Sequence, residues 1–183
     1  KNQASIPLAL EGVSGVYLVS PGGPEQAELQ GNMIEAAQQM GVRRLVKLST
    51  LSVSGDADMQ MSRWHAQTEE QLRESGLEYT ILRPHYFMQN LFRHTKSIRV
   101  EGRFYAPMGH AKISMVDIRD IAGVAVATLT GDCPERQQSK DIWVLSDQPV
   151  EVFSLMGGLQ TVADFQRGSD LPSRVADHLL WLG

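Results

Sequence analysis

A histidine and a glutamate lie one helical turn apart near the middle of the chain. His65 and Glu69 are four residues apart and share the helix face beside Trp64. A neutral histidine can donate a proton or a hydrogen bond, so His65 is our candidate catalytic residue. The alternative is a partly buried histidine whose ring is satisfied by Glu69 or by a backbone carbonyl. The sequence leaves both interpretations open.

A second group of polar and aromatic residues follows an apolar run. The segment from Thr80 to Leu82 has the character of a buried strand, and Pro84 ends it because proline lacks the N–H that a central strand needs. The residues after it can line a ligand pocket: His85, Tyr86, Phe87, Gln89 and Asn90. We predict that Pro84 lies at the edge of a sheet, beside an opening.

The elements that position these residues alternate along the chain. Apolar runs bounded by glycine, proline or polar residues predict strands at Gly15–Ser20, Leu45–Ser49, Tyr79–Leu82 and Ile142–Leu145. Helical spacing is found between these strands: before Gly41, after Ser62 as the expected N-cap, from Phe87 to about Lys96, and after Asp117 and Asp120. The alternation predicts an α/β fold of three layers, with a parallel sheet covered by helices on both faces.

In such sheets ligands bind outside the carboxyl ends of the strands. Those ends are expected at Ser20-Pro21, Ser49-Thr50, Arg83-Pro84 and Leu145-Ser146. We expect Arg83 to form a structural salt bridge with Asp117 or Asp120 rather than to bind phosphate. The five histidines are scattered, so we expect no metal site.

Length, net charge and cysteine content indicate the kind of protein and the partners it is not expected to bind. The 183 residues suit one domain, with a weakly patterned tail over residues 150–183, and the formal net charge is -4. The densest basic stretch, Arg93–Arg103, is interrupted by apolar residues and is interpreted as a solvated face. We therefore expect neither nucleic acid nor membrane as a partner. The single cysteine, Cys133, suits a reducing compartment, and we expect a cytoplasmic protein.

Several ordered motifs together resemble a known family. They are Gly15–Pro21, Asn32–Ala37 with Gly41-Val42, Leu45–Ser49, Trp64-His65 with Glu69, Ser75–Leu77, Thr80–Pro84, Phe87–Asn90, Tyr105–Pro107 and Val116–Ala122. Between Leu8 and Leu145 the sequence is similar to the NmrA-like branch of the atypical short-chain dehydrogenases/reductases. The resemblance implies a Rossmann-like fold, NAD or NADP as cofactor, and either reduction of a quinone-like or carbonyl acceptor or a non-catalytic redox-sensing role.

The resemblance also assigns roles to residues. Cofactor contacts are implied at the strand ends and at the position of His65, where many relatives carry a lysine: Ser20, Pro21, Ser49, Thr50, His65, Pro84, His85 and Tyr86. A substrate pocket is implied at Phe87, Asn90, Tyr105 and Pro107. Met61 stands where ordinary members carry a catalytic tyrosine, and a methionine cannot donate a proton.

One part of the family pattern is missing from this sequence. The family opens with a strand, a glycine-rich turn and a helix that bind the pyrophosphate, and no G-x-G-x-x-G-like turn precedes Gly12. The turn Pro21–Pro24 is no substitute, because prolines lack the N–H groups that a phosphate needs. We therefore expect a partial domain, truncated in its N-terminal half, which is catalytically impaired or inactive by itself. Beside NAD or NADP, the absence of any bound cofactor is the other outcome that the sequence leaves open.

Two alternatives stay open beside that expectation. The chain is an active NAD(P)H-dependent oxidoreductase if the missing part is supplied, or it is a non-enzymatic redox-sensing or binding module. Truncation would also leave the apolar strand Val16–Val19 at the edge of the sheet. An uncharged edge strand is open to pairing, so we expect a homodimer formed through it.

Overall fold

The computed structural model describes residues 5–102, 112–131, 140–145 and 150–151. These residues belong to two compact units: Lys1–Arg83 with Ala122–Ile142, and Pro84–Ile121 with Trp143–Gly183. Up to the boundary between the units the elements are α1 (Ser5–Ala9), β1 (Gly15–Leu18), α2 (Gln26–Gln39), β2 (Arg44–Leu48), α3 (Gln60–Glu74) and β3 (Glu78–Pro84). The later elements are the 3₁₀ helix η1 (Met88–His94), α4 (Thr95–Glu101), β4 (Lys112–Ile113), α5 (Ile118–Thr130), β5 (Lys140–Val144) and β6 (Val150–Glu151).

Four of the strands form one sheet in the order β1-β2-β3-β5. The first three are parallel, and their register sets Leu45 of β2 opposite Val16 of β1 and Tyr79 of β3. Because these strands run in one direction, the segments that follow them leave the sheet at the same edge. Pro84 is the last residue of β3, which confirms the predicted end of that strand.

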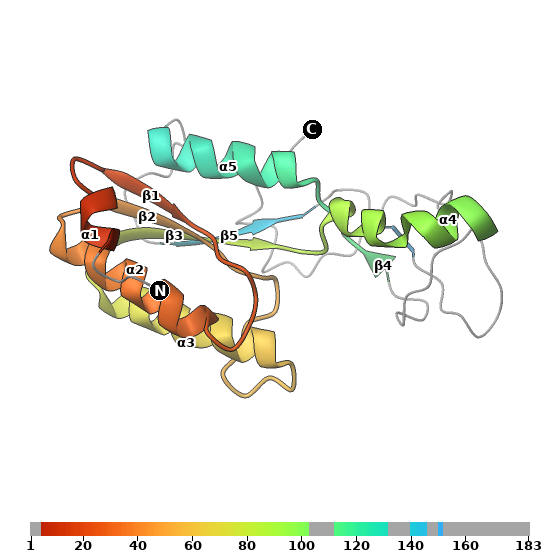
Figure 1. Cartoon of the computed structure of the whole chain (residues 1–183), viewed down its shortest axis with the longest axis horizontal. Coiled ribbons are helices and arrows are strands. Elements are labelled where there is room, and N and C mark those ends of the chain that lie inside the picture. Colours follow the sequence, from red (N-terminus) through yellow and green to blue (C-terminus); the bar gives the residue numbers. More distant parts are fainter. Residues whose placement is uncertain (1–4, 103–111, 132–139, 146–149, 152–183) are drawn as a thin grey trace. The chain divides into compact units, whose positions relative to one another are not determined.

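Helices cover both faces of this sheet. Helices α2 and α3 pack side by side on one face, and the part of α5 after Ala122 lies over the other (Figure 1). Arg44 ties β2 to α5, because its Nη1 donates a hydrogen bond of 2.8 Å to the carbonyl oxygen of Thr128. The three-layer α/β fold with a parallel sheet is therefore confirmed.

The core lies between the sheet and the α2–α3 layer. Leu18 and Leu45 from the strands meet Ile34 of α2 and Leu72 of α3, and all four side chains are buried. Both helices end at a glycine with a positive φ, Gly41 at 69° and Gly76 at 72°. Glycine adopts this left-handed conformation without a steric cost, so after each of the two helices the backbone can turn back into the next strand.

Three local predictions differ from the structure. Ser62 does not cap α3: the helix begins at Gln60, and the Ser62 hydroxyl instead donates to the carbonyl oxygen of Ser52 and accepts from the N–H of Ser54. The single helix predicted from Phe87 is divided into the 3₁₀ helix η1 and the α-helix α4, and His94, where they join, has φ -100° and ψ 6°. Strand β1 ends at Leu18, before the predicted Ser20.

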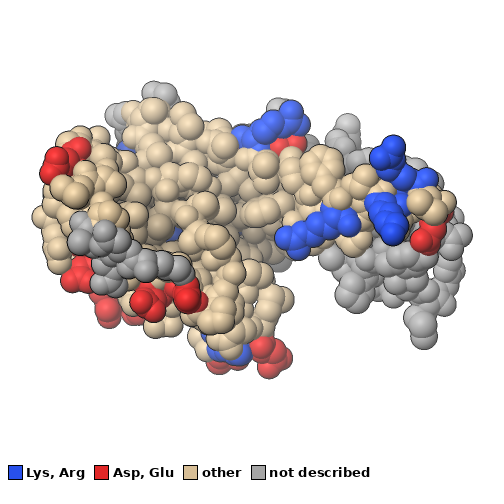
Figure 2. Space-filling model, viewed as in Figure 1, with Lys and Arg blue, Asp and Glu red and all other residues tan. Residues whose placement is uncertain are grey.

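The second unit contains short elements joined by backbone hydrogen bonds. Phe87 and Val116 form a parallel bridge, and β4 pairs with β6 in antiparallel register. Arg93, Lys96 and Arg99 are exposed, as predicted for a solvated face, and basic side chains gather on α4 in the space-filling view (Figure 2). Tyr105, Pro107 and the tail after Glu151 lie outside the described residues.

Strand β1 lies at one edge of the four-stranded sheet, and Tyr17 is 37% exposed there. The homodimer expected through this edge stays a prediction, which light scattering coupled to size-exclusion chromatography can test.

Candidate functional site

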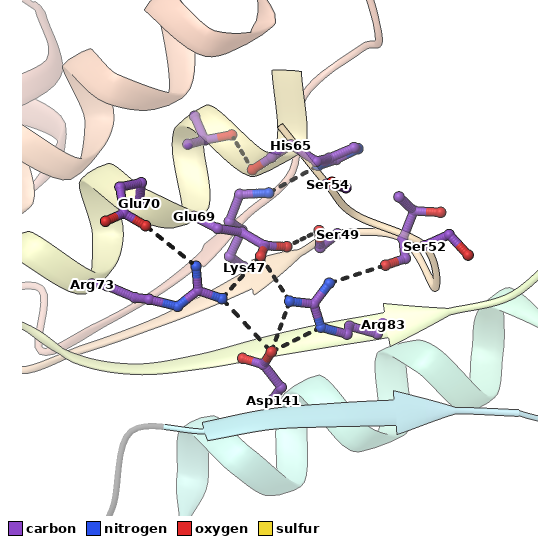
Figure 3. A network of polar contacts seen from close by, with 12 residues as sticks. Lys47, Ser49, Ser52, Ser54, His65, Glu69, Glu70, Arg73, Arg83 and Asp141 are labelled. Atoms are coloured by element: carbon purple, nitrogen blue, oxygen red, sulfur yellow. Dashed lines mark hydrogen bonds and ion pairs between the residues drawn. The ribbon is translucent and has the colours of Figure 1, made fainter. Parts of the chain in front are cut away.

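A buried polar network lies where α3 packs against the ends of the central strands. Lys47 and Ser49 alternate with apolar residues along and just beyond β2, so both side chains point to the same face of the sheet. His65 and Glu69 face them from α3, one turn apart (Figure 3). Residues two apart in the strand lie on one face of the sheet, and residues four apart in the helix lie on one face of the helix. This spacing brings the four side chains together.

Lys47 is the centre of this network, and no part of its side chain is exposed. Its Nζ donates to His65 Nδ1 at 2.9 Å and to the carbonyl oxygen of Leu48 at 3.2 Å. Burial lowers the pKa of Lys47 to about 8, and the charge of Glu69 partly opposes this effect. The side chain is therefore mostly a cation at neutral pH, but it gives up its proton far more readily than an exposed lysine. A lysine inside the apolar run from Leu45 to Leu48 is the sequence signal that could have revealed this network.

His65 is a neutral ring at physiological pH. It is 9% exposed, and burial, together with the charges of Lys47 and Arg83, lowers its pKa from 6.5 to about 4. An ammonium group can only donate, so Nδ1 must accept from Lys47, and the single proton of the neutral ring is then on Nε2. The expectation that Glu69 or a backbone carbonyl satisfies this ring was wrong, because its partners are Lys47 and Gln26.

The carboxylate of Glu69 binds a hydroxyl group and two guanidinium groups. Its carboxylate accepts from the Ser49 hydroxyl, from Arg83 Nη2 at 2.7 Å and from Arg73 Nη2 at 3.1 Å. Glu69 is 1% exposed, and a buried carboxylate is tolerated when cations and hydroxyls of this kind satisfy it.

Arg83 forms the salt bridge expected of it, but with different partners. Besides Glu69 it binds Asp141 of β5, through Nε at 2.9 Å and Nη2 at 2.7 Å. Asp117, one of the two expected partners, instead accepts from the backbone and guanidinium of Arg119 at the start of α5. The correct partner is 58 residues away in sequence, and it reaches Arg83 because β5 pairs with β3.

Helix α2 adds two buried amides to the site. Gln26 is 2% exposed and Gln30 is 1% exposed. Gln30 Nε2 donates to the Ser20 hydroxyl at 2.8 Å, while Gln26 Nε2 lies 3.2 Å from each ring nitrogen of His65. The side-chain oxygens of both glutamines lack a hydrogen-bond partner within the described part of the chain. Buried polar atoms usually have a hydrogen-bond partner, so these two oxygens are acceptors for which the described residues supply no donor.

The structure does not bring all of the predicted strand-end residues together. Ser49 joins His65 in the network around Lys47 and Glu69, while Ser20 is linked to Gln30. Thr50 is half-buried, and its carbonyl oxygen accepts from Arg83 Nη1 at 3.4 Å. Pro21 is exposed.

The remaining predicted residues belong to the second unit. Pro84 is buried, and His85 Nδ1 accepts from the backbone N–H of Tyr86 at 2.7 Å. Burial lowers the pKa of His85. Phe87 and Asn90 are half-buried, and the N–H of Asn90 donates to the carbonyl oxygen of Phe87 at 3.0 Å. Roles of these residues in binding remain predictions.

The described residues contain neither a metal-binding cluster nor a helix that could span a membrane. Groups of three or more histidine, cysteine, aspartate or glutamate side chains arranged to hold a metal ion are not found there. In the same part of the chain, each helix is too short or too polar to span a membrane.

Comparison with known proteins identifies the family. A family model described as NAD(P)H-binding matches residues 1–132. The chain belongs to this NAD(P)H-binding family. Family membership agrees with the predicted NAD(P)-type Rossmann-like fold, while the narrower NmrA-like assignment stays a prediction.

Proteins that are similar in sequence to this chain include reductases. An NAD(P)H azoreductase of Xenophilus azovorans is 39% identical over 133 residues, which cover 73% of this chain and 46% of the azoreductase. Quinone oxidoreductase 2 of Escherichia coli (strain K12) is 26% identical over 191 residues, which cover 97% of this chain and 66% of that protein. The first of these relatives is thus matched over about half of its length.

Solved structures show the same fold. An NADPH-dependent quinone oxidoreductase from Escherichia coli, solved with NADPH, superimposes with a TM-score of 0.70 at 25% identity. The match covers 81% of this chain and 51% of that one. A triphenylmethane reductase from Citrobacter sp., solved with NADP(H), has a TM-score of 0.69 at 20% identity over 82% and 53% of the two chains.

Two of the predicted cofactor residues in the described part of the chain carry hydroxyl groups. Ser20 and Thr50 are half-buried hydroxyls at the carboxyl ends of β1 and β2, and hydroxyls suit the ribose groups. Lys47 and Arg83 are buried and engaged within the network, so neither is a candidate ligand for phosphate. A role of Ser20 and Thr50 in holding a ribose stays a prediction.

The neutral state of His65 predicts a loss of stability in acid. The unfolded state binds a proton at His65 below pH 6.5, whereas the folded state does so only below about pH 4. Stability should therefore fall as the pH falls through this window, by roughly 3 kcal/mol for this group. Urea denaturation at several pH values should show a smaller decrease in His65→Gln than in the wild type, and equal decreases in the two proteins would contradict the neutral assignment.

Proposed function

We propose that this chain is part of an NmrA-like, NAD(P)H-dependent reductase that transfers hydride to a quinone-like acceptor. The observation that carries the proposal is membership of the NAD(P)H-binding family together with 39% identity to an NAD(P)H azoreductase. Azo compounds and quinones are both conjugated, electron-poor acceptors, and the names of two relatives refer to them. The parallel strand ends supply the place for such a reaction, because ligands of open α/β sheets bind there.

The site supports the proposal with a particular chemistry. Hydride transfer to a carbonyl or quinone leaves negative charge on an oxygen, and preorganised donors in a buried setting stabilise such charge. The network offers a neutral histidine N–H beside the buried cation of Lys47, both close to the end of β2. A non-catalytic binding module is the alternative, in which the network serves stability alone.

Titration calorimetry with NADPH, and in parallel with NADH, tests the proposal on this chain. We expect micromolar binding of at least one cofactor. A folded protein, judged by circular dichroism, that releases no heat with either cofactor would favour the predicted impaired module. Oxidation of the bound cofactor on addition of a soluble benzoquinone, followed by the loss of NADPH absorbance, then separates a reductase from a cofactor-binding sensor.

A further inference from the structure

The contact between Lys47 and His65 restricts the ring to one protonation pattern. Lys47 Nζ lies 2.9 Å from Nδ1 in an environment with little access to water, since the two residues are 0% and 9% exposed. The ammonium has no lone pair, so Nδ1 is the acceptor and the ring N–H is at Nε2. Lysine is therefore the residue that decides in which direction His65 donates.

The amide of Gln26 lies beside the ring of His65 without offering it an acceptor. Gln26 Nε2 is 3.2 Å from both ring nitrogens, and this amide nitrogen can donate to Nδ1 but cannot accept from Nε2–H, while the oxygen of the same amide lacks a partner in the described part of the chain. A buried donor without an acceptor is destabilising. The cost disappears when an acceptor oxygen from a ligand, or the turned amide of Gln26, reaches Nε2.

The charges around the ring favour an acceptor that carries negative charge. Lys47 from β2 and Arg83 from β3 both act on the ring as positive charges. Glu69, the buried anion on the same helix, is already bound by Arg83, Arg73 and the Ser49 hydroxyl. A donor supported by a buried cation stabilises an oxyanion more than a neutral oxygen.

We propose that Lys47 is a positioning residue that fixes the proton of His65 on Nε2, so that this N–H donates to an acceptor oxygen that becomes negative during reduction. The assignment of the ligand rests on the proposed function. Hydride transfer adds two electrons and one hydrogen to the acceptor and leaves one negative charge, which the Nε2–H stabilises until a solvent proton neutralises it.

Nuclear magnetic resonance tests the positioning role without any ligand. In the full chain labelled with ¹⁵N-histidine, the His65 signals are assigned by their absence in His65→Gln. We expect the neutral, Nε2-protonated tautomer in the wild type and in Lys47→Arg, whose guanidinium also donates. In Lys47→Met we expect a mixture of tautomers and a ring pKa closer to its ordinary value. A purely structural lysine would leave the tautomer unchanged, and that result would overturn the proposal.

Arg44→Met is the matched control, because Arg44 is a buried cation of the same strand that contacts Glu78 and Thr128 rather than His65. It should lower stability and leave the His65 tautomer as it is. A tautomer change in this variant as well would show a general effect of destabilisation and would count against Lys47.

Turnover with NADPH and a soluble benzoquinone tests the ligand assignment. Lys47→Met should lower kcat by about tenfold or more with little change in the KM for NADPH, a smaller loss than the roughly hundredfold expected for removing a direct donor. Lys47→Arg should recover most of the rate. A changed tautomer with an unchanged kcat would overturn the oxyanion role. A wild type that binds NADPH but shows no turnover would overturn the proposed reduction, while the tautomer experiment would still decide the positioning role.

Discussion

Replacing Glu69 with glutamine should lower the free energy of unfolding by about 3–5 kcal/mol, the usual cost of removing one partner from a buried ion pair. The side chain keeps its size, so packing is preserved and the change is electrostatic. Arg83 then keeps Asp141 as its anion, but Lys47 loses the charge of Glu69, which raises its pKa. Urea denaturation followed by circular dichroism measures the effect.

Glu70→Gln is the control for this substitution. Glu70 is the next residue of α3, its side chain is 67% exposed, and it lies 3.8 Å from Arg73. An exposed pair of this kind contributes about 1 kcal/mol or less, so the variant should unfold close to the wild type. Similar losses in the two variants would mean that burial of Glu69 is not what makes its charge important.

Truncating Leu72 to alanine should cost about 2–5 kcal/mol, the range for removing a large aliphatic side chain from a packed core. Leu72 is 0% exposed and belongs to the core cluster that joins α3 to the sheet and to α2. It also lies three residues after Glu69, so a loosened α3 should disturb the contacts of Glu69 with Arg83 and Ser49. Loss of stability should therefore be accompanied by a rise in the exposure of this network to hydrogen exchange.

Met61→Ala tests whether the effect of Leu72 arises from burial. Met61 lies on the same helix and is 44% exposed, so its truncation removes little packed volume. We expect a change of about 0.5 kcal/mol or less. If Met61→Ala were as damaging as Leu72→Ala, the cost would reflect the helix as a whole rather than the core beneath it.

The fold was predictable because its signals are local. The apolar runs around Leu45 and Ile81, the glycines at 41 and 76 and the proline at 84 each act within a few residues of their own position. Alternation of such strands with helices leaves few arrangements other than a covered parallel sheet. Boundaries were less accurate: Ser62 can cap a helix by its chemistry, but inside α3 its hydroxyl meets Ser52 and Ser54 of the preceding loop.

The candidate site was predictable only in part. His65, Glu69 and Ser49 were recognised as polar residues at the right end of the sheet, and the structure places them in one network. Lys47 was overlooked, because a lysine in a strand is usually assumed to point to solvent. Burial of a lysine depends on what covers it, and that depends on how α3 packs on β2.

The sequence by itself determined the order of strands and helices, the end of β3 at Pro84 and the presence of polar residues where the strands end. Tertiary structure alone decided which of these polar residues meet. Asp141 reaches Arg83 through strand pairing, and Lys47 meets His65 through the packing of a helix on a sheet. The physical reason is range: propensity and periodicity act over a few residues, whereas a buried charge takes its partner from any segment that the fold brings within hydrogen-bonding distance.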